Sequence, residues 1–344
     1  MPRAMIAMSG GVDSAVAAYL TLQEGYTCVG ATMQLHEDFT GAADAKQVAD
    51  RLGINLNILD FHAEFRTLVM DDFARCYELG FTPNPCVVCN RKIKFGMLLE
   101  AAQALGCSHL VTGHYARITQ KSGRYLLYKA VDAAKDQSYF LYALTQKQLS
   151  QIRFPLGELT KEQARQIALE QGFVNAKKRD SQDICFIPDG DYFNFLQRHT
   201  GKSYPAGNFL DRSGNVIGRH SGAVAYTLGQ RKGLGLATGS PVYVCSKDMA
   251  ANTVTVGPNE VLFHKALRAT DWFFQPFDTL TQSMRVMAKT RSRMREAPAT
   301  VYPEENCFAR VEFDAPQRAI TPGQAVVLYD GDIVVGGGTI TEVL

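Results

Sequence analysis

The sequence predicts an α/β protein, with an N-terminal domain built on a parallel sheet and two small, mostly β domains after it. Three observations lead to this prediction. The chain has 344 residues, enough for two or three domains of ordinary size. In its first half, short apolar runs alternate with segments of helical periodicity. After about Pro188, turn residues follow one another closely with short β-rich runs between them.

The elements of the first half follow one another in a regular order. Arg3–Met8 is the first predicted strand, and a Gly-rich turn joins it to the predicted helix Asp13–Gln23. The further predicted strands are Thr27–Met33, Asn55–Asp60 and His109–Thr112, and the further predicted helices are Asp44–Leu52, Phe95–Leu105 and Glu162–Gln171. A glycine follows each helix closely, as a helix end requires. Strands separated by helices of this length pair in parallel, with helices on both faces of the sheet.

The second half contains short β-rich runs between closely spaced turn residues. These runs are Val242–Cys245, Thr253–Val256, Arg285–Lys289, Phe308–Phe313, Ala325–Tyr329 and Ile333–Val335. Runs of this length between frequent turns are typical of small barrels and sandwiches. We therefore predict a first domain over 1–190, a central β-rich domain over 191–268 and a C-terminal barrel-like domain over 269–344.

Composition excludes several classes of protein. The formal net charge is +2, from 36 Lys and Arg against 34 Asp and Glu, which is too small for a globally basic nucleic-acid coat. No apolar run approaches the ~18 residues of a membrane span, so we expect no membrane partner. The N-terminus lacks a signal-peptide pattern, and the eight cysteines are scattered along the chain. We therefore expect a cytoplasmic protein in a reducing compartment.

The turn Ser9–Ser14 has the sequence of a phosphate-binding loop. Its two glycines let the backbone approach an anion, its serines can donate hydrogen bonds, and the following helix adds unpaired N–H groups. The alternative is a tight strand–helix turn in which Asp13 or Ser14 caps the helix. The complete hexapeptide at the first strand–helix junction favours nucleotide binding.

This hexapeptide resembles the PP-loop of the ATP pyrophosphatase superfamily, whose members split ATP into AMP and pyrophosphate to activate a carbonyl oxygen. Further blocks resemble, in order, those of the bacterial tRNA-specific 2-thiouridylases (MnmA/TrmU). They are Asn84–Asn90, Thr112–Arg117, Lys135–Leu141, Asp180–Phe186 and Thr227–Gly235. The resemblance runs from Met5 to about Thr339. It implies an N-terminal PP-loop domain with the adenine nucleotide alpha hydrolase-like fold.

The resemblance also implies a reaction, cofactors and partners. ATP, with Mg²⁺ near Asp13, would adenylate the C2 oxygen of the wobble uridine of tRNA. Cys185 would carry the incoming sulfur as a persulfide, and Cys89 would be the second catalytic thiol, leaving a Cys89–Cys185 disulfide. A cysteine desulfurase or sulfur-relay protein would charge Cys185. The residues that would bind the nucleotide are Ala7, Met8, Ser9, Gly10, Gly11, Val12, Asp13, Ser14, Met33 and Gly113. The residues that would contact tRNA are Asn84, Pro85, Cys86, His114, Lys135, Asp136, Gln137, Arg291, Ser292 and Gln324.

The surroundings of Cys89 predict a reactive thiolate. We expect it in a Pro-rich loop before the predicted helix at Phe95, and near the cations Arg91, Lys92 and Lys94. Nearby cations and a helix N-terminus both lower the pKa of a thiol.

Cys86 stands where many members of the family carry an acidic residue, so a carboxylate's role as a base is absent here. Cys86, Cys89 and Cys185 together are a three-thiol set that would suit an iron–sulfur cluster with one open iron. The alternatives are that Cys86 is a spare thiol or a second resolving cysteine.

Basic residues alternate along one predicted strand. Lys289, Arg291, Arg293 and Arg295 would project from one face and contact phosphates. A charged edge strand is the alternative. The family usually has an aromatic residue where this chain has Ser292, so base stacking is not expected there.

Two other functions have to be weighed against tRNA thiolation. A PP-loop ligase acting on a small molecule would need neither Cys89 nor Cys185. An RNA-binding module with structural cysteines would not need the Ser9–Ser14 loop.

Overall fold

A five-stranded parallel sheet organises the N-terminal half of the computed structural model, which describes residues 1–36, 41–176 and 184–344. The strand order is β3-β2-β1-β4-β7, and every pair in it is parallel. The strands are β1 (Arg3–Ala7), β2 (Thr27–Gln34), β3 (Leu56–Asp60), β4 (His109–Val111) and β7 (Ile152–Arg153). The predicted α/β class and parallel sheet are confirmed.

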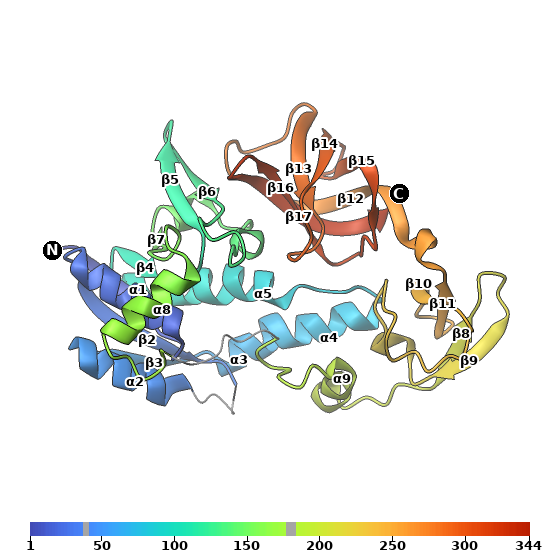
Figure 1. Cartoon of the computed structure of the whole chain (residues 1–344), viewed down its shortest axis with the longest axis horizontal. Helices are drawn as coiled ribbons and strands as arrows, with labels where there is room; N and C mark the ends of the chain where they lie inside the picture. The colour runs from blue at the N-terminus through green and yellow to red at the C-terminus, as the bar shows by residue number, and fades with distance from the viewer. Residues whose placement is uncertain (37–40, 177–183) are drawn as a thin grey trace.

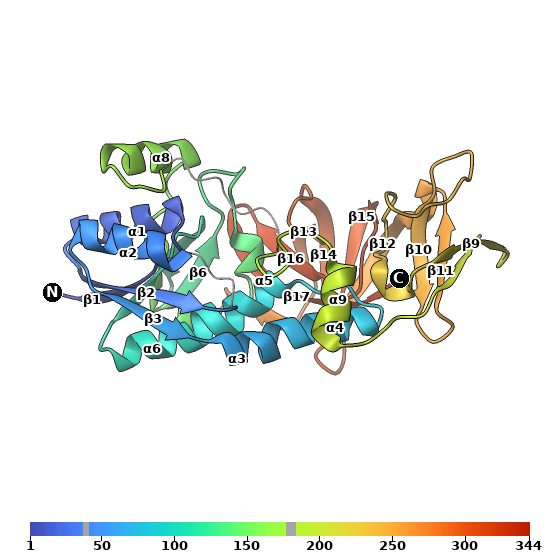
Figure 2. The same cartoon turned by 90° about the horizontal axis from the view of Figure 1, so that it is seen from below.

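Helices cover both faces of this sheet because its central strand is apolar on both sides. Ala4 and Ile6 of β1 pack with α1 (Val12–Gln23), α2 (Gly41–Leu52) and α8 (Lys161–Glu170). Met5 faces the opposite side and packs with α6 (Leu98–Ala104). Figure 2 shows α1, α2 and α8 on one side of the strands and α6 on the other.

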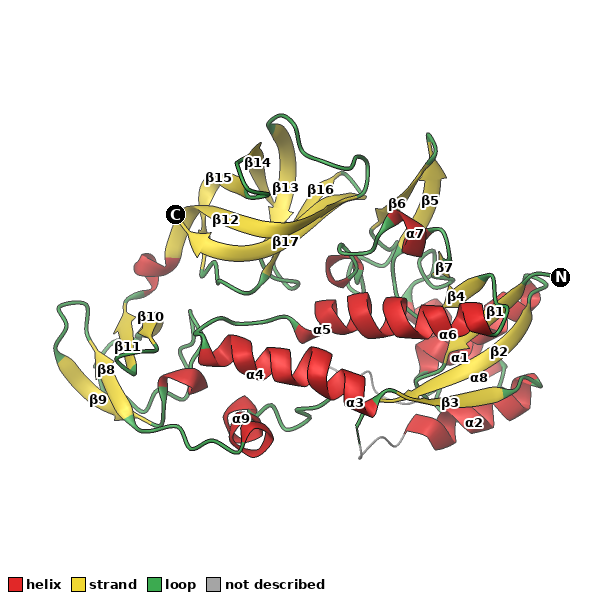
Figure 3. Cartoon of the chain, turned by 180° about the vertical axis from the view of Figure 1, so that it is seen from behind, coloured by secondary structure: helices red, strands yellow, loops and turns green. Residues whose placement is uncertain are grey.

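Two long helical segments extend from the sheet through the middle of the molecule, side by side in Figure 3. The first consists of α3 (His62–Phe65), the π-helical turn η1 (Arg66–Met70) and α4 (Asp71–Glu78). The second consists of α5 (Pro85–Val88), the π-helical stretch η2 (Cys89–Met97) and α6. The predicted helix at Phe95 therefore begins ten residues earlier, with Asn84 as its N-cap and Pro85 in its first turn.

The central β-rich part has the strand order β10-β11-β8-β9. These strands are β8 (Gly207–Leu210), β9 (Val216–His220), β10 (Tyr243–Asp248) and β11 (Thr253–Gly257). The helix α9 (Tyr192–Thr200) connects this part to the first half, since the rings of Phe195 and Phe73 lie 5.7 Å apart. In Figure 1 this part occupies the end of the molecule opposite to the N-terminus.

An eight-stranded sheet closes into a barrel through the pairing of β12 with β17. Its order is β12-β15-β14-β13-β16-β17-β6-β5. The strands are β12 (Phe263–Phe274), β13 (Met284–Lys289), β14 (Ala297–Pro303), β15 (Ala309–Arg318), β16 (Ala325–Asp330) and β17 (Ile333–Val343), with the hairpin β5 (Arg117–Lys121) and β6 (Arg124–Tyr128) from the first half. Tyr128 of β6 pairs with Ile333 of β17. The C-terminal barrel is as predicted, but it begins at β12, so residue 268 falls inside a strand.

Short helical turns complete the described part of the chain. They are η3 (Ser138–Phe140), α7 (Gln146–Leu149), η4 (Ala223–Ala225) and η5 (Asn259–Leu262). None of the helices in the described ranges has the length and apolar character that a membrane crossing requires.

Candidate active site

The Ser9–Ser14 loop follows β1 at the carboxyl edge of the sheet and leads into α1. Gly10 has a φ of +74°, and a Cβ there would lie 2.5 Å from the carbonyl oxygen of Gly41, so only glycine fits. The Ser14 hydroxyl donates to the Gly11 carbonyl oxygen over 2.9 Å and accepts from the Ser9 N–H over 3.2 Å. Gly11 is the N-cap of α1 and has no side chain to cap it. The alternative of a cap by Asp13 or Ser14 is therefore wrong, and the first N–H groups of α1 face the loop.

Asp13 is held by three contacts on the inner side of this loop. Both of its carboxylate oxygens accept hydrogen bonds from the Lys161 ammonium, each over 2.8 Å. The Tyr115 hydroxyl donates to the same carboxylate over 2.9 Å. A Cβ on Gly113 would lie 2.7 Å from the Asp13 carbonyl carbon, so this glycine makes room for the loop backbone.

Lys161 did not figure among the residues selected from the sequence. It is the first residue of α8, after the capping box formed by Thr160 and Gln163. A lysine in the first turn opposes the helix dipole, and this unfavourable placement is the signal in the sequence that points to a special role. Its side chain is only 9% exposed.

Met33 connects the loop edge of the sheet to the thiols. It lies near the end of β2, on the carboxyl edge where the Ser9–Ser14 loop also lies. Its side chain packs against the cluster of buried residues Phe65, Val69, Cys89 and Ile93. The nucleotide loop and Cys89 therefore belong to one region of the molecule.

The structure brings Cys86, Cys89 and Cys185 together. Cys86 in α5 and Cys89 at the start of η2 lie one helical turn apart, and Phe186 beside Cys185 packs on the apolar cluster around Cys89. The ring of Phe186 lies 5.7 Å from that of Phe65. Cys86 and Cys185 are exposed, whereas Cys89 is buried.

The predicted low pKa of Cys89 is wrong. Burial raises the pKa of Cys89 to about 12, and the attraction of the nearby Lys94 ammonium offsets only part of this effect. The Cys185 and Cys86 thiols raise it further. Burial also raises the pKa of Cys86 and of Cys185 above the ordinary thiol value. All three are therefore protonated thiols at neutral pH in this arrangement.

The reason for that error is the position of Cys89 in the helix. Cys89 lies inside the segment that begins at Pro85, so it faces no helix N-terminus. The Arg91 guanidinium lies 4.5 Å from the centre of the Phe273 ring, and Lys92 is exposed. Of the three expected cations, only Lys94 acts on the pKa of Cys89.

The described residues do not fit a metal centre. Across residues 1–36, 41–176 and 184–344, no group of three or more His, Cys, Asp and Glu side chains is placed to hold a metal ion. The three thiols are close enough to affect one another's pKa values without forming such a ligand set. The cluster alternative therefore finds no support in this arrangement. Residues 180–183 of the predicted block Asp180–Phe186 lie outside the described residues.

His114 packs against Phe95 and is not exposed as a free base. Its Nδ1 lies 2.7 Å from the Thr112 hydroxyl, and its ring contacts those of Phe95 and Phe154 at 5.6 and 5.7 Å. Burial lowers the pKa of His114 well below its usual value, and Lys94 lowers it further. The imidazole is therefore neutral at physiological pH.

Two of the residues assigned to tRNA in the block Lys135–Gln137 shape their own loop. The Asp136 carboxylate accepts from the N–H groups of Ala130 and Ser138 and from the Ser138 hydroxyl. The Gln137 side-chain oxygen accepts from the Tyr115 N–H over 3.0 Å, which ties the loop to the residue beside His114. Lys135 is half-buried.

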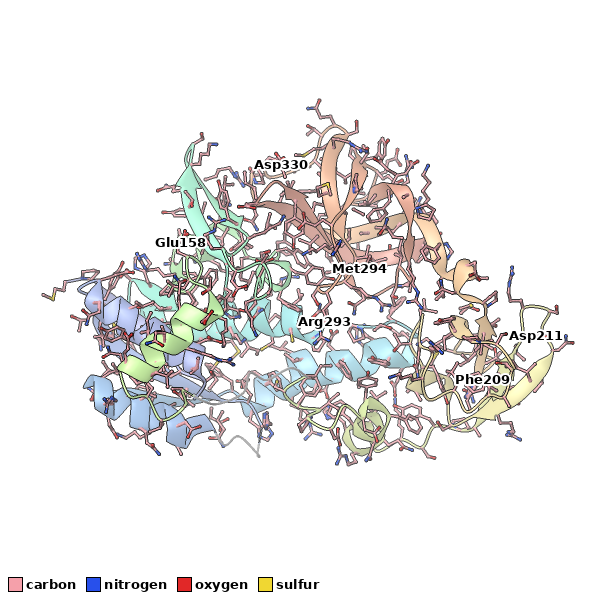
Figure 4. The ribbon with its side chains drawn as sticks, in the orientation of Figure 1. Glu158, Phe209, Asp211, Arg293, Met294 and Asp330 are labelled. Carbon is pink, nitrogen blue, oxygen red and sulfur yellow. The ribbon has the colours of Figure 1, made fainter. Side chains whose placement is uncertain are left out.

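The predicted basic strand is wrong, because β13 ends at Lys289 and residues 290–294 form a turn. The Arg291 guanidinium donates to the carbonyl oxygens of Leu228 and Ala319 and to the Thr321 hydroxyl. Arg293 and Arg295 are exposed, and Ser292 is half-buried. In Figure 4, Arg293 and Met294 lie on the side of the barrel toward α5.

Gln324 joins the barrel to the segment that leads into α5. Its side-chain amide donates to the carbonyl oxygens of Thr82 over 2.9 Å and of Pro83 over 3.1 Å. The Thr82 N–H in turn donates to the Pro322 carbonyl oxygen. These bonds fix the start of the Asn84-Pro85-Cys86 segment against the barrel. Pro85 is buried and Asn84 is half-buried.

The fold and the loop define a HUP-domain protein with two β-barrel domains. Residues 2–189 match the family described as tRNA methyl transferase HUP domain. Residues 193–258 match the tRNA methyl transferase PRC-barrel domain, and residues 264–340 match the aminomethyltransferase beta-barrel domain.

Full-length relatives identify the family more closely. The tRNA-specific 2-thiouridylase MnmA of Acetivibrio thermocellus is 47% identical, covering 98% of this chain and 99% of its own. The proteins of the same name from Clostridioides difficile and Carboxydothermus hydrogenoformans are 45% and 46% identical over 99% of this chain, and over 99% and 98% of their own lengths. The chain belongs to the MnmA family of tRNA-specific 2-thiouridylases.

Proposed function

We propose that this chain is an ATP-dependent sulfurtransferase that forms 2-thiouridine at the wobble position of tRNA. The observation that carries the proposal is the position of Met33, which lies on the edge of the sheet that bears the Ser9–Ser14 loop and packs on the cluster that contains Cys89. A uridine activated at this loop would lie within the same region as the sulfur-bearing thiols. Membership of a family whose relatives are named 2-thiouridylases supports the substrate and the reaction.

The first step is activation of the uridine. ATP binds as its magnesium salt, with its phosphates at the first N–H groups of α1 and at the Ser9 and Ser14 hydroxyls. The C2 oxygen attacks the α-phosphorus, the bond to the β-phosphate breaks and pyrophosphate leaves. A magnesium ion bound with the nucleotide would neutralise phosphate charge and favour the departure of pyrophosphate. The nucleotide-binding residues are those of Ala7–Ser14 together with Met33 and Gly113.

The second step is sulfur transfer. Cys185 carries the outer sulfur as a persulfide, supplied by a cysteine desulfurase or a sulfur-relay protein. The Cys89 thiolate attacks the inner sulfur, so that a Cys89–Cys185 disulfide forms and hydrosulfide is released. The hydrosulfide attacks C2 of the uridine and AMP leaves. A thiol reductant returns the disulfide to two thiols.

The burial of Cys89 requires an opening motion before this attack. Its side chain lies among Phe65, Val69 and Ile93, and its raised pKa keeps it protonated there. Cys86 is the second candidate for the attacking thiol because it is exposed and one turn away on the same helix.

Bound tRNA supplies the target base from the side where the barrel faces the helices. We propose contacts with Asn84, Pro85 and Cys86 at the base, and with His114 beside it. Further proposed contacts come from Lys135, Asp136, Gln137, Arg291, Ser292 and Gln324. We also propose that the reaction takes place in the cytoplasm, where tRNA and the sulfur donor would both be available.

The experiment is a thiolation assay with tRNA, ATP and a persulfide source, read by mass spectrometry of the nucleosides. Cys185→Ser is expected to abolish 2-thiouridine formation, and Cys89→Ser to reduce it at least a hundredfold, while both variants bind tRNA normally. Cys307→Ser is the control, because that exposed thiol lies on the barrel between β14 and β15. Full thiolation by Cys185→Ser would contradict the proposal. AMP formation with a small-molecule acceptor and no tRNA would favour a ligase instead.

A further inference from the structure

We propose that Lys161 is a nucleotide-positioning residue of the Ser9–Ser14 loop, which holds Asp13 and provides a positive charge for the polyphosphate. The identity of the nucleotide rests on the proposed function. The residue itself is identified by its contacts with the loop.

The Ser9–Ser14 loop contains no positive charge that could attract the phosphates of a nucleotide. The segment Ser9–Ser14 contains one carboxylate, Asp13, and no basic residue. A second carboxylate, Asp44, is also near, since a Cβ on Gly10 would lie 3.2 Å from the Asp44 Cβ. Carboxylates beside the loop disfavour a bound polyphosphate where water is partly excluded. A cation fixed at the loop would therefore strengthen the binding of Mg-ATP.

Lys161 is placed to supply that cation. Its ammonium lies 2.8 Å from each oxygen of Asp13, and its side chain is 9% exposed. The residues are 148 positions apart in the sequence, so the contact exists only in the folded chain. An ammonium has three N–H donors, so it can keep one bond to the carboxylate and turn another toward a phosphate oxygen when the nucleotide binds.

The backbone around Lys161 fixes the place of this side chain. The Lys161 N–H donates to the Asp132 carboxylate over 2.9 Å, and the Thr160–Gln163 capping box sets the start of α8. The N-termini of α1 and α8 therefore meet at Asp13, and both favour negative charge there. This convergence adds to the attraction that the ammonium exerts on an anion.

Holding α8 in place is not a sufficient explanation for the ion pair. Ala164 and Ala168 of α8 are fully buried in the same apolar cluster as Ala15 and Ala18 of α1. This contact holds the two helices together without a charge. The Lys161 side chain is 9% exposed and the Asp13 side chain 31%, so forming the ion pair costs much of the hydration of the ammonium, and the pair adds little net stability compared with apolar packing. The position of Lys161 is better explained by the ligand than by the packing of α8.

The test is calorimetric titration of the whole protein with Mg-ATP and with AMP, without tRNA. We expect Lys161→Met to weaken ATP binding at least tenfold and AMP binding less than threefold, because AMP lacks the β- and γ-phosphates. Lys161→Arg is expected to recover part of the ATP affinity. Lys147→Met, on the exposed side of α7, is the control and should bind ATP as the unaltered protein does.

The double variant Asp13→Asn with Lys161→Met separates ligand binding from charge neutralisation. If Lys161 only neutralises Asp13, removing both charges will restore ATP affinity, and the proposal is overturned. If Lys161 acts on the phosphates, the double variant will still bind ATP at least tenfold more weakly than the unaltered protein. Unchanged ATP affinity in Lys161→Met would also overturn the proposal.

Folding and catalysis are kept apart in this design. Thermal unfolding of each variant shows whether it is folded, and Lys161→Arg provides the comparison if Lys161→Met does not fold. A chain that binds ATP through Lys161 but does not thiolate tRNA would contradict the proposed function alone. A chain that thiolates tRNA with unchanged ATP affinity in Lys161→Met would contradict this inference alone.

Discussion

Gly113 and Asp13 meet so closely that a Cβ on residue 113 would lie 2.7 Å from the Asp13 carbonyl carbon. The turn after β4 and the first turn of α1 are thus in backbone contact. The carboxyl edge of the sheet is shaped by this contact, since any side chain at residue 113 displaces the phosphate loop. The residue at position 113 therefore affects the affinity for ATP even if it contacts no atom of the nucleotide.

Replacement of this glycine is expected to impair nucleotide binding more than folding. Gly113→Ala should weaken ATP binding at least tenfold, because the loop must move to admit the methyl group. Calorimetric titration with Mg-ATP measures the effect. Gly106→Ala is the control, because a Cβ there meets nothing within 4 Å, although its φ of +70° costs about 1 kcal/mol of stability. Equal ATP affinities in the two variants would show that the close approach of residue 113 to the Asp13 backbone has no effect on nucleotide binding.

The three thiols should differ in their rates of alkylation. At pH 8 we expect iodoacetamide to modify Cys86 and Cys185 before Cys89, because Cys89 is buried and its pKa is raised to about 12. Only the thiolate reacts, so protonation and burial both slow the reaction at Cys89. Peptide mass spectrometry over a time course measures the order. Cys89 reacting first would contradict the buried arrangement.

Lys247 is expected to destabilise the fold at neutral pH. Its Nζ is buried without a hydrogen-bond partner among the described residues, 6.0 Å from the centre of the Tyr77 ring. Burial lowers the pKa of Lys247 from 10.5 to about 8. Lys247→Met should therefore raise the free energy of unfolding at pH 7 by about 1–4 kcal/mol, the range seen when buried charges are replaced by apolar groups.

The pH dependence of stability gives an independent check on Lys247. Between pH 8 and 10.5 the unfolded lysine binds a proton that the folded lysine has lost, so the stability of the unaltered protein rises over this window. Denaturant unfolding from pH 7 to 10 should show the advantage of Lys247→Met shrinking as pH rises. A constant difference between the two proteins would mean that the ammonium is not the cause.

Gln324 should matter for the attachment of the segment before α5. Gln324→Leu removes two hydrogen bonds and leaves the carbonyl oxygens of Thr82 and Pro83 without that donor. A loss of about 1–3 kcal/mol of stability is expected. Gln317→Leu is the control, since the Gln317 side chain is half-buried and its hydrogen bond to the nearby Ala315 carbonyl oxygen is exposed to solvent. Equal melting temperatures for the two variants would contradict this role.

Helices and strands whose apolar residues recur at a regular spacing could be predicted from the sequence, and those in which the spacing changes could not. The first strands and helices appear close to their expected bounds, since each has apolar residues at one spacing. The helical segment 62–78 was not predicted, and the segment 85–104 was predicted too short. Both contain π-helical turns, which shift the phase of the apolar residues.

Contacts between residues far apart in the chain could not be predicted from the sequence either. The alternation of basic residues over 289–295 resembled a strand, but a turn interrupts it after Lys289. The pairing of Asp13 with Lys161 joins residues 148 positions apart, and no local pattern reports such a contact. The loop and the thiols could be recognised in the sequence, whereas the position of Lys161 beside the loop is seen only in the folded structure.

The pairing of β6 with β17 bears on how the protein is made on the ribosome. Arg117 of β5 and Asp332, next to β17, form an ion pair across 215 residues of chain. The hairpin β5–β6 is therefore synthesised long before the strand that covers its edge. Until translation reaches β17, that edge is open to pairing with other chains, which makes it a natural site for a chaperone to protect. A truncated mRNA that ends before β17 would yield a chain in which β6 has no partner strand, and such a chain is prone to aggregate.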